Sequence, residues 1–219
     1  RTSATVPTFT QTGTATSNVS NLIPGFYYAM PLTFSGLPQN TFTFGFSVSA
    51  PFGLSTNYSN NSVIRYSSTL AKIQVIDVSP SIAYKINNKY SIGLGIDFEH
   101  MDLDFRSAFG APAFGLALDS IGKNVGEAWG WGYHVGILGQ LTPQFRAGLT
   151  YHSSVTENLS GYSSLSGRLV TFPPGTVPAT ITNNNFHTKF TLPASTVLSG
   201  QYDVNKQWKV NGSLYYTWW

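Results

Sequence analysis

Residues 76–98 read IDVSPSIAYKINNKYSIGLGIDF, and this stretch decides the fold. Its two halves alternate between apolar residues and small or polar ones, and a four-residue turn at 86–89 joins them. The apolar positions are Ile76, Val78, Pro80, Ile82, Tyr84 and Ile86 before the turn, and Tyr90, Ile92, Leu94, Ile96 and Phe98 after it. A period of two residues on both sides of a short turn predicts an antiparallel hairpin with one apolar face.

The opposite face of this hairpin carries mostly Ser, Gly and Ala, with isolated charges such as Asp97 and Glu99. A soluble sheet would usually present Lys, Glu, Thr and Arg to water, whereas small residues suit a curved, crowded interior. Each apolar run is about as long as the roughly 9–11 residues that a tilted strand needs to cross a bilayer. The hairpin therefore predicts a membrane-spanning barrel.

The composition agrees with spanning by strands. Only 10% of the 219 residues are charged and 15% are aromatic, against roughly 25% charged residues in an average soluble domain. The mean hydropathy is −0.03, and no run approaches the ~18 apolar residues of a membrane helix. We expect a single domain that crosses the membrane with strands, if it crosses at all.

Charge and motifs argue against several other classes of protein. The net charge is only +3 and the basic residues are scattered, so nothing favours nucleic-acid binding. The chain has no cysteine and none of the common hydrolase, zinc-protease or phosphate-loop motifs. His100, His134, His152 and His187 show no metal-ligand spacing. We therefore expect no enzymatic activity, no catalytic residue, no metal ligand and no cofactor.

Eight strands can be traced, and the connections alternate in length. Short turns are expected at 35–40, 86–89, 141–144 and 203–206, and long extracellular-type loops at 53–68, 107–127 and 163–188. Such alternation is typical of outer-membrane barrels. Aromatic residues that end the apolar runs, among them Tyr84, Tyr90, Trp129, Trp208 and Trp218, fit two interfacial girdles.

The eight strands are interpreted as an incomplete, all-β, antiparallel up-and-down barrel. The residues of the inner face are too small to fill a closed eight-stranded core, and the first and last strands would have unpaired edges. The chain begins at Arg1 without a recognisable secretion signal, and we expect a truncated segment in which 1–219 forms one partial barrel domain.

The alternation changes parity in both strands of the central hairpin. Apolar residues occupy odd positions at Ala71, Ile73 and Val75, and again at Met101, Leu103 and Phe105. Either a bulge shifts both strands, or the sheet leaves the membrane there and its outer face becomes wet.

Several segments resemble one family of transporters. They are the PFGLST stretch at 51–56, the hairpin SPSIAYKINNKYSIGLG at 79–95, the WGWGY run at 129–133 leading to 136–138, TLP at 191–193 and YTW at 216–218. In order and spacing they resemble the FadL-type outer-membrane transporters of long-chain fatty acids and other hydrophobic compounds, the OMPP1/FadL/TodX family. The resemblance covers most of residues 25–219.

The resemblance implies a bacterial outer-membrane barrel of about fourteen strands with an N-terminal hatch, which this chain lacks together with the C-terminal strands. It implies ligand capture in an outer groove, then an internal pocket, and sideways exit at a kinked strand. The kink maps to Pro51, Phe52, Gly53 and Leu54. The groove maps to the loops 107–127 and 163–188, where Arg106, Phe109, Phe114, Leu116, Leu118 and Phe172 are the candidate ligand-binding residues.

The residues alone leave alternatives open at these positions. Gly53 could be an ordinary strand terminator, and the apolar loop residues could form the core of a folded lid instead of a groove. Arg106 could hold a fatty-acid carboxylate, or it could pair with Asp102, Asp104 or Glu99. Asp97, Glu99, Arg146 and Lys85 are interpreted as a luminal charge network.

We therefore expect passive outer-membrane transport of long-chain fatty acids or other hydrophobic molecules by a protein that is monomeric at full length and contacts outer-membrane lipid and lipopolysaccharide. A fatty acid needs a cationic anchor, whereas an aromatic hydrocarbon does not. The alternative is a non-transporting β-protein, an adhesin or a soluble β-sandwich, whose long loops bind a partner. The barrel requires Phe44, Ile92, Leu94, Ile137 and Leu214 to face lipid.

Overall fold

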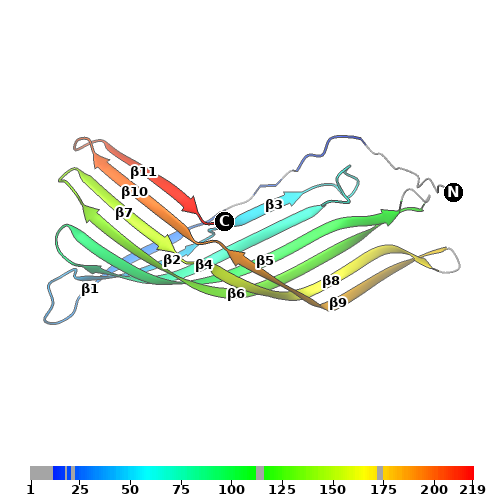
Figure 1. Ribbon diagram of the computed structural model, residues 1–219, viewed down its shortest axis with the longest axis horizontal. Coiled ribbons are helices and arrows are strands. Elements are labelled where there is room, and N and C mark those ends of the chain that lie inside the picture. Colours follow the sequence, from blue (N-terminus) through cyan, green and yellow to red (C-terminus); the bar gives the residue numbers. More distant parts are fainter. Residues whose placement is uncertain (1–11, 18, 21–22, 112–115, 172–174) are drawn as a thin grey trace, which may run out of the picture.

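The computed structural model describes residues 12–17, 19–20, 23–111, 116–171 and 175–219. They form one antiparallel sheet of eleven strands (Figure 1). The strands are β1 (Phe26–Leu32), β2 (Phe42–Ser49), β3 (Gly53–Asn57), β4 (Leu70–Lys85), β5 (Tyr90–Ala111), β6 (Leu116–Gln140), β7 (Phe145–His152), β8 (Val155–Thr171), β9 (Gly175–Leu192), β10 (Ser195–Asp203) and β11 (Lys209–Thr217). In this part of the chain we find no helix with the length and apolar character that a membrane crossing needs.

The eleven strands make eight passes along the sheet, as predicted. The order across it is β1-β2-β4-β5-β6-β7-β10-β11, while β3 pairs with β4, and β8 pairs with β6 and β9. Interruptions at 50–52, 153–154 and 193–194 each divide one pass into two strands. The four predicted short turns gather at one end, here called the short-turn end, and the other end is called the far end (Figure 1).

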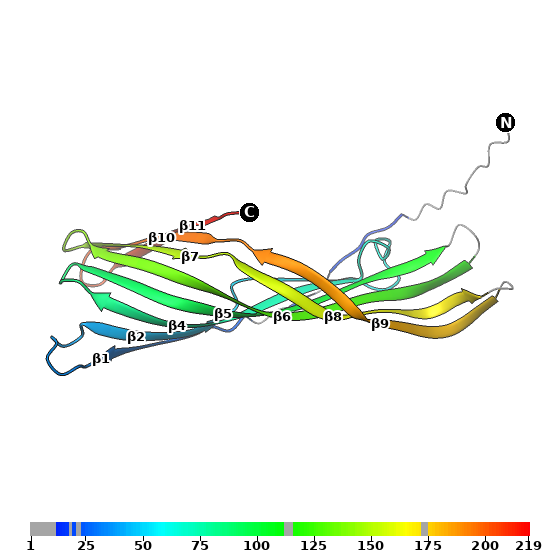
Figure 2. The same cartoon turned by 60° about the horizontal axis from the view of Figure 1, so that its bottom comes forward.

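The sheet is curved and open, as Figure 2 shows from a second direction. Its edges in the strand order are β1 and β11, and no pairing joins these two strands within the described residues. An open antiparallel sheet of eight passes confirms the predicted segment of a barrel wall.

The two faces of the sheet follow the predicted alternation. The outer face exposes apolar side chains near the short-turn end, with Ile92, Leu94 and Ile137 each 45–54% exposed. The inner face carries buried polar groups on the alternate positions, including Asp97 and Glu99. In a membrane protein the exposed apolar face is the one that contacts lipid.

The change of parity in β4 and β5 is explained without a bulge. Val78 pairs with Phe98 and Leu70 pairs with Arg106, in one unbroken register. Even-numbered residues of β5 therefore stay on the outer face, which becomes polar beyond Phe98, while the inner face becomes apolar. The register thus excludes the bulge, and departure of the sheet from the membrane at this level stays a prediction.

Two of the predicted long loops are instead strands. The β5–β6 ladder continues through Ser107 and Gly122, and the β8–β9 ladder through Leu165 and Ile181. The expectation of loops at 107–127 and 163–188 was wrong, because pairing between neighbouring strands continues where the apolar alternation of the sequence fades.

An apolar cluster lies on the inner face toward the far end. Its buried members come from β4, β5, β6, β8 and β9, and partly buried aromatic residues pack against it. The buried residues are Val75, Met101, Leu103, Ala128, Val155, Leu159 and Leu192. From the short-turn end to the far end, the inner face therefore changes from polar to apolar, whereas the outer face changes from apolar to polar.

Candidate functional site

The interruption between β2 and β3 contains one extra residue. Ser49 pairs with Asp77 on β4, but Gly53 pairs with Gln74, so four residue steps on one strand lie opposite three on the other. Pro51 lies inside this bulge, where a residue without an N–H breaks no ladder hydrogen bond. Phe52 packs against the inner apolar cluster. The strand is thus interrupted at the position of the predicted kink.

A cavity of about 280 Å³ lies at this interruption. Ile23 and Pro24, which precede β1, line it together with residues of β2, β3 and β4. The other lining residues are Val48, Ser49, Ala50, Phe52, Gly53, Leu54, Ser55, Lys72, Ile73, Gln74 and Ile76. Most of these side chains are apolar, so the cavity suits a hydrophobic molecule. Three of the four predicted kink residues, Phe52, Gly53 and Leu54, line it.

Apolar side chains on the inner face of β5 lead from the far end toward this cavity. Phe109 and Phe105 are 56% and 38% exposed, and Leu103 and Met101 follow them in the buried cluster. All four are odd-numbered residues of one strand in unbroken register to Phe109. Phe52 extends the cluster to the kink.

Charged side chains occupy the inner face below the apolar cluster. Asp97 Oδ1 lies 2.6 Å from His134 Nδ1, and Asp97 Oδ2 lies 3.3 Å from His152 Nδ1. Lys85 and Arg146 instead line a hollow of about 290 Å³ at the short-turn end. The structure therefore divides the four residues predicted as one luminal charge network into two separate groups.

Sequence spacing did not indicate the histidine pair. His134 and His152 are 18 residues apart in the sequence, but they pair directly across β6 and β7. Only the register of the two strands reveals that they meet.

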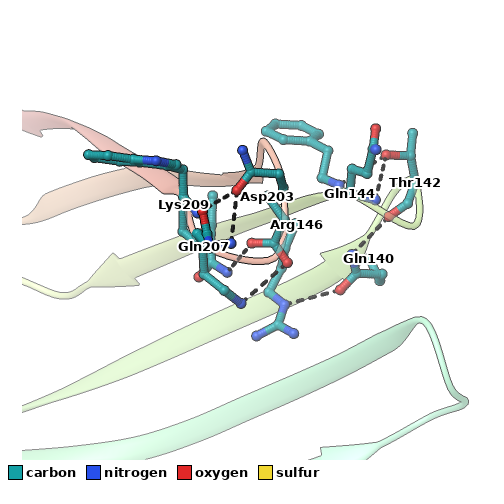
Figure 3. A network of polar contacts seen from close by, with 11 residues as sticks. Gln140, Thr142, Gln144, Arg146, Asp203, Gln207 and Lys209 are labelled. Carbon is teal, nitrogen blue, oxygen red and sulfur yellow. Dashed lines mark hydrogen bonds and ion pairs between the residues drawn. The ribbon is translucent and has the colours of Figure 1, made fainter.

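A polar network covers the short-turn end of β6, β7, β10 and β11 (Figure 3). Arg146 donates from Nε to Gln140 Oε1 at 3.2 Å, and Lys209 Nζ lies 3.3 Å from Asp203 Oδ2. These contacts join neighbouring strands across their turns, so they hold the strand ends in place.

At the far end, the connection between β3 and β4 is fastened to β6. Arg65 Nε donates to Asp119 Oδ2 and the Tyr66 hydroxyl donates to Asp119 Oδ1, both at 2.6 Å. Burial alone would raise the pKa of Asp119, but the hydrogen bonds from Tyr66 and Arg65 hold that pKa below its ordinary value. The carboxylate is therefore charged at neutral pH and secures this connection.

The candidate ligand-binding residues do not form one cluster in the described part of the chain. Arg106 lies on the outer face and binds Asp104 through two hydrogen bonds, at 2.6 and 2.9 Å, which raise the pKa of its guanidinium. Phe109 lies on the inner face over Gly122. Phe114 and Phe172 lie outside the described residues. Leu116 and Leu118 belong to β6 by their backbone, and their side chains lie outside the described part.

The antiparallel sheet is open, its outer face has a lipid-facing apolar band, its inner face has a polar part and an apolar part, and one strand is interrupted. These features define the wall of a bacterial outer-membrane β-barrel. Comparison with known families identifies which one. Residues 2–219 match the family described as outer membrane protein transport protein (OMPP1/FadL/TodX), and the chain belongs to this family of outer-membrane transport proteins.

Its relatives are similar along nearly the whole chain. A long-chain fatty acid transport protein of Escherichia coli O6:H1 is 27% identical over 224 residues, which cover 90% of this chain and 48% of the relative. Outer membrane protein P1 of Haemophilus influenzae is 24% identical over 223 residues, covering 90% and 46%. The chain thus spans about half the length of these relatives.

Solved structures show the same fold. A FadL homologue of Pseudomonas aeruginosa aligns with a TM-score of 0.73 at 16% identity, over 89% of this chain and 48% of that one. The toluene transporter TbuX of Ralstonia pickettii aligns with a TM-score of 0.65 at 19% identity, over 88% and 54%. Identities this low show the fold alone.

Proposed function

We propose that the full-length protein carries hydrophobic molecules across the outer membrane by passive diffusion, and that they leave sideways through the cavity at the β2–β3 interruption. The observation that carries this proposal is that cavity of about 280 Å³ beside a bulge containing Pro51. It opens in a lipid-facing wall, so a molecule there could enter the bilayer without crossing the polar short-turn end.

The inner face supplies the route to this exit. Phe109, Phe105, Leu103 and Met101 follow one another on β5, and Phe52 connects them with the kink. Moving an apolar molecule from water onto apolar surface is favourable in itself. Passage down a concentration gradient along this route therefore needs no energy source.

The substrates that we propose are long-chain fatty acids or other hydrophobic small molecules, including aromatic hydrocarbons. Relatives are named for fatty-acid transport and solved neighbours for toluene transport. A fatty acid brings a carboxylate that a cation would stabilise. Arg106 lies on the face opposite the apolar route and would also have to release Asp104 to serve as that cation, so its role as an anchor stays a prediction. We further propose that the protein acts as a monomer in contact with outer-membrane lipid and lipopolysaccharide.

The test is uptake of labelled oleate and labelled toluene by cells that lack their own porter and carry the full-length gene. A β-carbon at Gly53 meets no atom within 4 Å, so Gly53→Trp fills the cavity without a backbone clash. The matched control is Gly212→Trp on β11, which also has open space. We expect the Gly53 variant to lose uptake and the Gly212 variant to keep it.

The two substrates separate the remaining possibilities. If Arg106→Ala loses oleate uptake but keeps toluene uptake, Arg106 is the anchor. If the variant takes up both substrates as well as the unchanged protein does, the anchor is removed from the proposal. If neither substrate enters cells with the unchanged protein, the transport function itself is wrong and partner binding at the far end becomes the better account.

A further inference from the structure

Six titratable side chains meet on the inner face below the apolar cluster, and we call them the acid–histidine cluster. They come from five strands: β4, β5, β6, β7 and β8. Its members are Asp77, Asp97, Glu99, His134, His152 and Glu157. Glycines on neighbouring strands make room for them, since a β-carbon on Gly95 would overlap the ring of His134 and one on Gly130 would lie 2.5 Å from Glu157 Oε1.

The carboxylates of the cluster are buried. Asp77 and Glu99 are each 7% exposed, Asp97 is 3% exposed, and Glu157 is fully buried. Several of their oxygens have no hydrogen-bond partner among the described residues, namely Asp77 Oδ1, Glu99 Oε2 and both carboxylate oxygens of Glu157. Burial of an unpaired, ionised carboxylate is unfavourable, so these groups are either protonated or compensated by a positive charge.

The described residues do not supply enough of that charge. Four carboxylates face two imidazoles, so with all four ionised the cluster would carry an excess of two negative charges even if both histidines were charged. Within the described part of the chain, no lysine or arginine forms an ion pair with any of the four.

The hydrogen bonds of Ser79 point to the same deficit. Its hydroxyl oxygen contacts a carboxylate oxygen of Asp77 and lies 2.9 Å from Asp97 Oδ1. A hydroxyl has a single hydrogen and can donate to only one of them. Two carboxylates therefore converge on one donor, a close approach that a cation between them, or a proton on one of them, would stabilise.

The ligand atoms suit a divalent transition metal. One ligand atom from each of Asp97, His134 and His152 lies within 4.8 Å of the others. Imidazole nitrogens and a carboxylate oxygen are ordinary ligands of Zn²⁺, and in a tetrahedral site with bonds of about 2.0–2.1 Å the ligand atoms stand ~3.3 Å apart. The contact of His152 with Asp97 Oδ2 already has this length. The 2.6 Å contact of His134 is with the other oxygen, Asp97 Oδ1, so binding of an ion through one oxygen requires these side chains to move apart. Asp77 is connected with Asp97 through the Ser79 hydroxyl, so its charge would help to neutralise the ion.

We propose that the acid–histidine cluster binds a divalent transition-metal ion of the Zn²⁺ class through Asp97, His134 and His152. The ion joins β5, β6 and β7 from the inside, and Ser79 and Asp77 connect it with β4. Asp77 pairs with Ser49, the last residue of β2 before the bulge. The ion thus fastens the inner wall directly beside the interrupted strand, whatever molecule that strand lets pass.

The test uses full-length protein in detergent, first freed of metal with a chelator and then titrated with Zn²⁺ by calorimetry, with bound metal counted by elemental analysis. One double variant, His134→Ala with His152→Ala, removes the proposed ligands. The control, His187→Ala, removes a histidine outside both groups of possible ligands among the described residues, because the second group is His100 with Asp102 and Glu127. We expect the first to bind one ion fewer than the unchanged protein and the second to bind as many.

Asp97→Asn keeps the shape of the site and loses its charge, so it covers the case in which the double variant does not fold. Its affinity should fall by about tenfold or more, because a neutral amide is a poor ligand for such an ion. Equal zinc binding by the double variant and by the His187→Ala control would overturn the proposal. Absence of binding by the unchanged protein would also overturn it, since protons or a basic side chain from elsewhere would then supply the positive charge.

Discussion

The backbone N–H of Val75 donates a hydrogen bond to the carbonyl oxygen of Phe52 at 3.0 Å, in the middle of the interruption between β2 and β3. This bond keeps the bulge attached to β4 although the register shifts by one residue around it. The strand is therefore bent and not broken. Its bulge is a feature that a single deletion can remove.

Deletion of Pro51 should restore one continuous strand. Ala50 and Phe52 would then lie opposite Ile76 and Val75, which keeps Phe52 in the apolar cluster while the register becomes regular. We expect the cavity to shrink and uptake of hydrophobic substrates to fall, with stability unchanged or higher. Pro51→Ala retains the extra residue and should retain uptake, so equal uptake by the two variants would contradict the role of the bulge.

Two neighbouring positions on β5 test the orientation of the sheet in the membrane. Leu94→Arg places a charge on the lipid face and should lower the free energy of unfolding by about 2–4 kcal/mol near the bilayer midplane. Gly93→Arg directs the same side chain to the inner face, where a β-carbon would make only ordinary contacts at 3.7 and 3.9 Å. Reversible unfolding by denaturant in lipid vesicles measures both variants, and a larger loss for Gly93→Arg would reverse the assignment of the faces.

The buried inner cluster should contribute strongly to stability. Met101 is fully buried at its centre, and Met101→Ala should cost roughly 2–5 kcal/mol because it leaves a cavity. Ile96→Ala removes a lipid-facing side chain that is 47% exposed, and lipid can fill the space. The same unfolding measurement should therefore show a smaller loss for Ile96→Ala, and comparable losses would mean that the cluster is not well packed.

Asp119 should make the attachment of the β3–β4 connection sensitive to pH. Its pKa is lower in the folded protein than the value near 3.9 of an unpaired aspartate. The carboxylate therefore contributes stability at all pH values above about 4, and that contribution is lost as the pH falls through the lowered pKa.

Amide hydrogen exchange of residues 58–68 is the appropriate measurement for this attachment. At neutral pH, Asp119→Asn should speed exchange there, whereas Asp104→Asn, which removes the partner of Arg106, should not. If Asp119→Asn leaves the exchange of 58–68 unchanged, the contacts with Arg65 and Tyr66 do not hold the connection.

Much of the barrel wall could be predicted from the sequence because lipid imposes a strict alternation. Ile92, Leu94, Ile137 and Leu214 lie exposed on the outer face as expected, whereas Phe44, which pairs with Ile82 on β4, is half-buried. The four short turns also follow from the sequence, since each separates two clear apolar runs. Beyond Phe98 apolar and polar residues exchange faces within an unbroken register, so the simple pattern fails.

The functional residues were predictable only in part. Pro51 and Gly53 mark the kink because proline and glycine disturb a strand, but the cavity depends on Ile23 and Pro24, which the pattern of the strands does not connect with it. The meeting of His134 and His152 depends on the register between β6 and β7. That register is a property of the paired sheet, and spacing along the chain does not reveal it.

A reversible block of the cavity tests the proposed exit most directly. The cells carry the full-length gene with Gly53→Cys as the only cysteine. Uptake of labelled oleate and toluene is measured three times: before modification, after reaction with a bulky thiol reagent, and after reduction. Gly212→Cys is the matched control. The account predicts that uptake falls on modification of Gly53→Cys and returns on reduction, with no change for the control. Uptake that persists with the Gly53→Cys cavity fully modified would contradict it.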